Sequence, residues 1–372
     1  MTAKQIWLGA YSPGGLALPA AQPTASQLYA PRGVFFNDDV LVAADSGNHR
    51  ILIWHGVPDS DGRAADVVLG QPDFASEGSK LLHLPTGVMV HEGKLIVADS
   101  WHHRLLVWNR IPETNNAAPD YAIGQPDVGS VAVNRGQAAP SADSLYWPYG
   151  FGFASGRFWI ADTGNRRVLG WRTLPAVNGP AEIVLGQPNF ASSEENHGAE
   201  ASAASFRWPH AIAGDADSLL IADAGNHRVL GWRPAPLRDC DATLVLGQPD
   251  FITARELPYI QQGATRLRFP YSIASNNGRI AVADTANNRI LLWDEIPRNG
   301  VNHAAAHVLG QENFNTNGEN RWKAVTHDSL CWPYGIWMHA GRLAVADSGN
   351  NRVTIWNLSE ALAAEPAASA AA

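Results

Sequence analysis

Asp45-Ser-Gly-Asn-His-Arg50 and Asp223-Ala-Gly-Asn-His-Arg228 are two copies of a six-residue core that recurs along the chain and decides the fold. Six copies occur, with their aspartates at positions 45, 99, 162, 223, 284 and 347, so neighbouring copies lie 54 to 63 residues apart. Self-similarity at a fixed period is the sequence signature of a repeat architecture. The period excludes two unrelated domains and predicts one unit copied six times.

Each unit carries three further marks at fixed places. A tryptophan follows the core arginine by four residues, and we expect it in the protein interior because a buried indole removes a large area from water. An apolar-Gly-Gln element, such as Leu69-Gly70-Gln71, comes next and is expected to end an outer strand. After a loop, a proline opens another short apolar run; these prolines are Pro31, Pro85, Pro148, Pro209, Pro270 and Pro333.

The third unit shows what these marks predict. Short apolar runs at 148–154, 158–161, 168–171 and 182–185 are separated by turn residues, which is typical of a four-stranded propeller blade. The last unit stops after its third run, whereas Ile6-Trp-Leu8-Gly9 supplies an unmatched strand at the other end. The sequence therefore predicts an all-β, six-bladed β-propeller with four antiparallel strands per blade. We expect the N-terminal strand to complete the C-terminal blade and remove exposed sheet edges.

The domain boundaries follow from the same count. We expect a single propeller domain over residues 4–358 and an Ala-rich, disordered tail over 359–372. The six-residue core resembles the NHL repeat, with Arg in place of the Leu that gives the family its third letter. This resemblance implies a six-bladed propeller, and it extends over about residues 6–358. It implies little about function, because the same ring serves lyases, lactonase-like hydrolases and modules that bind protein or RNA.

Composition limits the classes of partner. Lys and Arg number 27 against 35 Asp and Glu, a net charge of -8, which argues against nucleic-acid binding because such affinity rests on neutralising phosphates. We find no apolar run near 18 residues and no secretory signal, so no membrane partner is expected. Two cysteines do not make a disulfide framework. Together these features predict a cytoplasmic protein.

Residues present in every unit are expected to be architectural, since one active site needs no six-fold copy. The Asp and Arg of each core flank a turn, and we expect a carboxylate–guanidinium pair that fixes it, with the aspartate also accepting turn N–H groups.

Departures from the repeat are where a unique site is expected. The residue after each proline should ring one mouth of the central channel, on the same face as the long loops. There the sequence has Arg32, Thr86, Tyr149, His210, Tyr271 and Tyr334. Three of the residues just before the prolines are Trp147, Trp208 and Trp332. Arg suits a carboxylate and Tyr can stack and donate a hydrogen bond, so these residues, Thr86 apart, are the predicted ligand-binding set.

Histidines at unusual places raise a second hypothesis. His210 replaces Tyr, His102 replaces the core Asn, and His83 stands two residues before Pro85, so His83, His102 and His210 are candidate ligands of a Zn²⁺-like ion. The sequence leaves open whether the protein is an enzyme. It favours a module that binds a small molecule or a protein segment at the channel mouth, with a metal-assisted lyase or hydrolase as the alternative and RNA binding ranked last.

Overall fold

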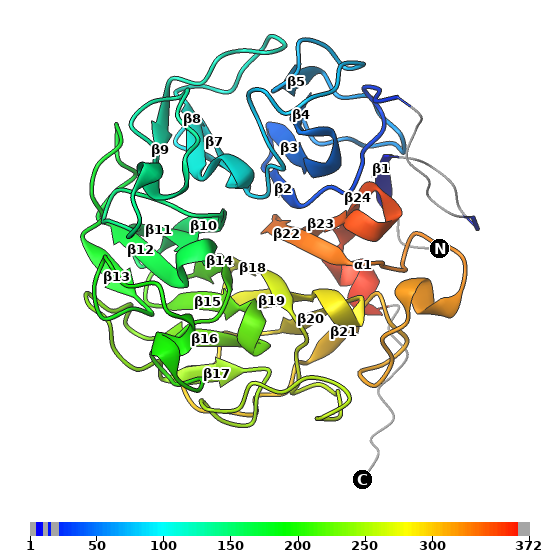
Figure 1. Ribbon diagram of the computed structural model, residues 1–372. Helices are drawn as coiled ribbons and strands as arrows, with labels where there is room; N and C mark the ends of the chain where they lie inside the picture. Colours follow the sequence, from blue (N-terminus) through cyan, green and yellow to red (C-terminus); the bar gives the residue numbers. More distant parts are fainter. Residues whose placement is uncertain (1–4, 10–13, 16–21, 364–372) are drawn as a thin grey trace.

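Six four-stranded antiparallel sheets surround a central axis in the computed structural model, which describes residues 5–9, 14–15 and 22–363 (Figure 1). Within each sheet the strands follow chain order from the axis outward, except that β1 forms the outer edge of the last sheet. The fold is the predicted six-bladed β-propeller. Among the helices of these residues, none has both the length and the apolar character needed to cross a membrane.

The strands of the blades have the following bounds. The first blade contains β2 (Gly33–Phe36), β3 (Val40–Asp45), β4 (Arg50–His55) and β5 (Val67–Leu69). The second contains β6 (Val88–His91), β7 (Lys94–Asp99), β8 (Arg104–Trp108) and β9 (Tyr121–Ile123). The third contains β10 (Pro148–Ala154), β11 (Arg157–Asp162), β12 (Arg167–Trp171) and β13 (Ile183–Leu185).

The remaining blades repeat this order. The fourth contains β14 (Pro209–Gly214), β15 (Leu219–Asp223), β16 (Arg228–Trp232) and β17 (Leu244–Leu246). The fifth contains β18 (Pro270–Asn276), β19 (Arg279–Asp284), β20 (Arg289–Trp293) and β21 (His307–Leu309). The sixth contains β22 (Pro333–His339), β23 (Arg342–Asp347), β24 (Arg352–Asn357) and β1 (Ile6–Gly9).

The ring closes as the sequence predicted. Strand β1 pairs antiparallel with β24, in a register that places Ile6 opposite Ile355 and Gly9 opposite Arg352. Trp7 and Leu8 are completely buried in this closure. After β24 the chain forms a short helix, α1 (Leu358–Ala363), which buries Leu358 and Ala361. The expected disordered tail therefore does not begin at residue 359, and its remainder, 364–372, lies outside the described residues.

The core aspartate and arginine of every blade form the expected buried pair. The arginine Nε lies 2.6–3.0 Å from the aspartate Oδ2, and both side chains are at most 1% exposed. The aspartate Oδ2 also accepts a turn N–H, as expected, from the side chain of the core Asn in five blades. The aspartate Oδ1 accepts a backbone N–H from the loop before the inner strand. The pair thus joins the turn to that loop. The six repeated tryptophans are buried, as predicted.

Short 3-10 turns join the second and third strands of each blade: η1 (Ser46–Asn48), η2 (Ser100–His102), η4 (Thr163–Asn165), η6 (Ala224–Asn226), η7 (Thr285–Asn287) and η9 (Ser348–Asn350). Five of them begin with Ser or Thr, whose hydroxyl donates to the carbonyl of the proline opening the next blade. These bonds place the turns and the starts of the inner strands at the same end of the ring. They confirm that the residues after the prolines share a face with the turns.

Small residues let the inner strands approach one another. Gly150 lies two residues after Pro148, and a Cβ there would sit 2.3 Å from the carbonyl oxygen of His210 in the next blade. A Cβ on Gly33 would meet the Thr86 carbonyl oxygen at 2.1 Å. Because these contacts hold the inner strands together at the channel mouth, they fix the positions of the residues that precede them.

Candidate functional site

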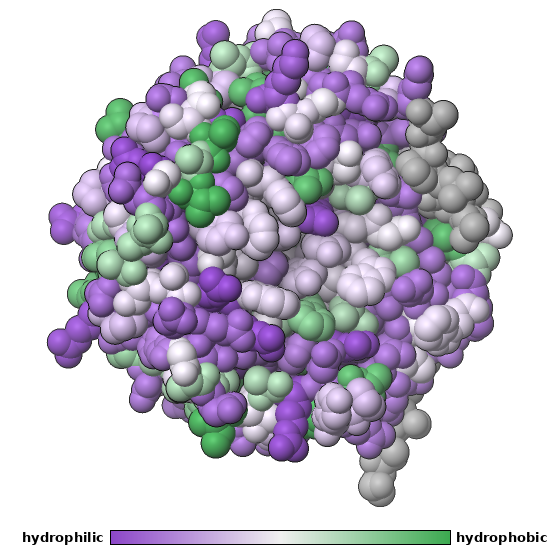
Figure 2. Space-filling view, in the orientation of Figure 1, coloured by the Kyte–Doolittle hydropathy of each residue, from purple (hydrophilic) through white to green (hydrophobic). Residues whose placement is uncertain are grey.

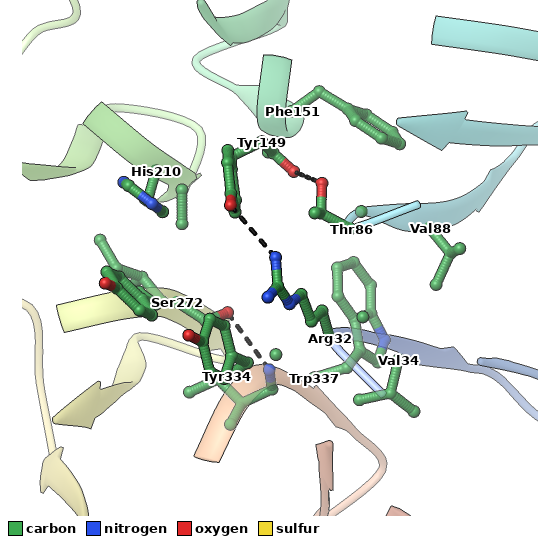
Figure 3. Close-up of a pocket in the computed structure, with 18 of the residues that line it drawn as sticks. Arg32, Val34, Thr86, Val88, Tyr149, Phe151, His210, Ser272, Tyr334 and Trp337 are labelled. Atoms are coloured by element: carbon green, nitrogen blue, oxygen red, sulfur yellow. Dashed lines mark hydrogen bonds between the residues drawn. The ribbon is translucent and has the colours of Figure 1, made fainter. Parts of the chain in front are cut away.

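The six residues that follow the blade-opening prolines line one cavity at the channel mouth, a point that the sequence left open (Figure 3). The cavity has a volume of about 80 Å³. Deeper in the channel its lining becomes apolar, with Val34, Val88, Phe151, Ile212, Ile273 and Ile336. In the space-filling view, residues of intermediate hydropathy surround the centre of this face, around a small strongly hydrophilic patch (Figure 2).

Four aromatic rings form a continuous arc around the mouth. His210 lies between Tyr149 and Tyr271, with ring centroids 4.4 Å and 4.5 Å away, and it stacks on Tyr271 at an interplanar angle of 13°. Tyr271 in turn contacts Tyr334, with 4.8 Å between the centroids. Aromatic pairs of this kind stabilise the packing by more than the burial of their surface alone accounts for.

Arg32 closes this arc into a ring. Its guanidinium carbon lies 5.1 Å from the centroid of the Tyr334 ring, and its Nη1 donates to the Tyr149 hydroxyl at 3.2 Å (Figure 3). The sixth residue of the mouth, Thr86, has a short side chain that takes no part in this ring and donates to the Tyr149 carbonyl oxygen at 2.6 Å. No Asp or Glu is among the described residues that line the cavity. The guanidinium charge therefore has no carboxylate partner within it.

His210 is neutral at neutral pH. Its side chain is buried, and its Nδ1 lies 2.9 Å from the Trp208 carbonyl oxygen. Because a carbonyl only accepts, Nδ1 carries the proton and Nε2 is left as an acceptor. Burial, helped by the nearby Arg32 charge and opposed by the hydrogen bond to the Trp208 carbonyl, lowers the pKa of His210 to about 4. Burial also raises the pKa values of Tyr271 and Tyr334, so Arg32 is the charged group of the ring at neutral pH.

The three tryptophans of the predicted binding set do not share one position. Trp147 and Trp208 line a second cavity of about 220 Å³, which adjoins the first because Tyr149, His210 and Tyr271 line both. Trp332 lines neither cavity. It is 38% exposed, and its Nε1 donates to Glu319.

The three histidines of the metal hypothesis lie in two places. His83 and His102 are neighbours, with 5.4 Å between ring centroids, whereas His210 is held in the aromatic arc. A second imidazole beside His83 belongs to His49, with 5.0 Å between the ring centroids. His102 is also hydrogen-bonded through Nδ1 to Asp99. In the part of the chain that the structure describes, no group of three or more His, Cys, Asp or Glu has an arrangement suited to a metal ion.

Two residues, one beside His83 and one in the lining of the second cavity, escaped the sequence analysis. His49 and Arg166 both follow the core Asn, a position occupied by His, His, Arg, His, Asn and Asn from the first unit to the sixth. Comparing the units at this position singles out Arg166 as its one arginine. The structure places Arg166 in the lining of the second cavity.

Comparisons with known proteins bear on the fold. No family model matches the chain, and no curated protein matches it. Among solved structures, an auxiliary nutrient binding protein from Bacteroides thetaiotaomicron VPI-5482 aligns over 95% of this chain and 76% of its own, with 9% identity and a TM-score of 0.55. A streptogramin B lyase aligns over 91% and 95% of the two chains, with 14% identity and a TM-score of 0.47. At such identities the likeness concerns the fold alone.

Proposed function

We propose that this protein is a ligand-binding propeller that takes a small organic anion at its channel mouth. Arg32 carries the proposal: its guanidinium lies among aromatic rings in a cavity whose described lining holds no carboxylate. A planar guanidinium suits a carboxylate because it offers two parallel N–H donors. The hydroxyls of the neighbouring tyrosines are further donors to an anion, and the rings stack on an apolar body.

The size and charge of the cavity favour a small molecule over a protein segment. The cavity at Arg32 is smaller than the cavity that adjoins it, about 80 Å³ against about 220 Å³, so we place the acidic group in the first and the body of the ligand toward the second. A neutral His210 adds an acceptor at Nε2 without a second positive charge. The metal-assisted lyase or hydrolase is less well supported, because His210 is stacked between tyrosines while His83 and His102 lie with His49.

The repeat supports a place for the chain among NHL-type propellers through its six Asp-to-Arg cores. A structural neighbour named as a nutrient binding protein is compatible with a binding role for such a ring.

The test compares matched charged and neutral probes. Benzoate and phenylacetate, with benzamide and phenylacetamide as neutral counterparts, are titrated by calorimetry into the protein and into Arg32→Thr, which installs the residue that the second blade carries. A charge-assisted hydrogen bond contributes about 1.5–3 kcal/mol, so binding of the carboxylates should weaken at least about tenfold in the variant. Arg172→Thr, at an exposed arginine on the third blade, is the control and should bind normally. Equal binding of acids and amides, no binding of the acids, or an unaffected Arg32→Thr would contradict the proposal.

A further inference from the structure

The seam between the third and fourth blades departs from the pattern of the other five. In those five, the residue after the 3-10 turn has a left-handed backbone, and its side chain accepts the backbone N–H of the residue that precedes the next blade's proline. The acceptors are an imidazole Nδ1 or an amide Oδ1, at 2.8–3.3 Å, from His49, His103, His227, Asn288 and Asn351. Their partners all have φ between 46° and 51°: Leu84, Trp147, Phe269, Trp332 and Ala30.

Arg166 occupies this position at the third seam, and a guanidinium has no acceptor. Its Nη1 donates back to the Gly164 carbonyl at 2.7 Å. The N–H of Trp208 is therefore bonded elsewhere, to Asp223 Oδ1 at 3.2 Å. Trp208, unlike its five counterparts, is not among the residues with positive φ. One substitution in the repeat has thus changed the backbone in front of the fourth blade.

The second cavity lies at this altered seam. Its lining comprises Tyr146, Trp147, Tyr149, Thr163, Gly164, Arg166, Trp208, His210 and Tyr271. No acidic residue belongs to this described lining. The Nε atom of Arg166 is buried and has no hydrogen-bond partner, which is costly for a charged group in a protein interior. The cavity therefore combines aromatic walls with a guanidinium that has no carboxylate partner in the described lining.

We propose that Arg166 forms a second anion subsite, so that the ligand is a small aromatic dianion, such as an aromatic dicarboxylate. This inference rests on the proposed function. Arg32 takes one acidic group and Arg166 the other, while the planar body lies along Tyr149, His210 and Tyr271, the residues common to both cavities. A ligand with acids at both ends satisfies both guanidinium groups, whereas a monoanion leaves one without a partner.

The repeat itself supplies the test variants. Arg166→His and Arg166→Asn install residues found at the other five seams, so both should fold and offer the Trp208 N–H the acceptor that those seams provide. Isophthalate, terephthalate and biphenyl-4,4′-dicarboxylate are titrated by calorimetry alongside benzoate. We expect at least one dicarboxylate to bind the parent protein ten times more tightly than benzoate. Both Arg166 variants should lose this preference and keep their affinity for benzoate.

The outcomes separate the two proposals. If benzoate binds through Arg32 but no dicarboxylate is preferred, or if both Arg166 variants keep the preference, the second subsite is refuted and the first proposal stands. If benzoate binding is absent or insensitive to Arg32→Thr, the proposed function itself fails. If neither Arg166 variant folds, Arg166→Lys, which keeps the charge, replaces them. Loss of the two parallel N–H donors of the guanidinium should weaken dicarboxylate binding at least tenfold, and unchanged binding would overturn the subsite.

Discussion

His210 should contribute to the acid sensitivity of the protein, and replacing it with Tyr should remove that contribution. Tyr is the residue of the third, fifth and sixth blades at this position, so His210→Tyr tests a change that the ring already accommodates. The pKa of His210 is about 4 in the fold, against an ordinary value of 6.5. Between these pH values the unfolded chain binds a proton that the folded protein does not. Stability is therefore retained above pH 6.5 and lost as the pH falls toward 4.

The size of the effect follows from the pKa difference. Each pKa unit corresponds to about 1.4 kcal/mol, so His210 alone accounts for a loss of about 3 kcal/mol between neutral pH and pH 4. Between neutral pH and pH 4, the free energy of unfolding should therefore fall by about 3 kcal/mol less in His210→Tyr than in the parent protein. Urea unfolding followed by tryptophan fluorescence at pH 7.5, 6.0, 5.0 and 4.0 measures the difference.

The control is His55→Tyr, at an exposed histidine that ends β4. It should follow the parent protein at every pH. The absolute stability of His210→Tyr at pH 7.5 does not enter the test, because only the change with pH reports on protonation. Parallel pH profiles for His210→Tyr and the parent would refute the assignment of a buried, neutral imidazole at the channel mouth.

Two further substitutions test the architecture that holds the site. Gly150→Ala should lower the melting temperature by several degrees, because its Cβ would lie 2.3 Å from a carbonyl oxygen. The control is Gly179→Ala, where the nearest atom is 3.9 Å away and the melting temperature should change little. Equal effects of the two substitutions would contradict the close approach of the inner strands. Arg167→Met removes one partner of a buried ion pair and should lower the free energy of unfolding in urea by about 3–5 kcal/mol. Arg172→Met, at a side chain that is 79% exposed, is the control and should lower it by less than about 1 kcal/mol. A loss at Arg167 as small as that at Arg172 would mean that the core pairs do not stabilise the blades.

The repeat explains why the fold was predictable from the sequence. Six copies of one core fix the number of blades, and an extra strand at the N-terminal end with a strand lacking from the last unit fixes how the ring closes. The positions of Arg32, Tyr149 and His210 followed because each stands directly after a proline whose place in the blade is set by the repeat. Periodicity therefore predicts backbone positions, and it predicts side-chain neighbours where the backbone of all copies is the same.

Side-chain neighbours at the seams between blades were less predictable. They depend on which group accepts the backbone N–H of the residue before each blade-opening proline. Arg166 cannot accept it, and the backbone at Trp208 differs as a result. Trp332 keeps the ordinary seam bond to Asn288 and lies outside both cavities. The sequence predicted that His83, His102 and His210 lie together. The structure places His83 beside His102, whereas His210 lines the channel mouth.

A crystal of the protein soaked with 4-bromobenzoate, measured at the bromine absorption edge, tests the central claim most directly. The account predicts one strong anomalous peak at the channel mouth, with the carboxylate hydrogen-bonded to the Arg32 guanidinium and the ring against Tyr149, His210 or Tyr271. A bromine site elsewhere, with the carboxylate on other residues and nothing bound at Arg32, would contradict it.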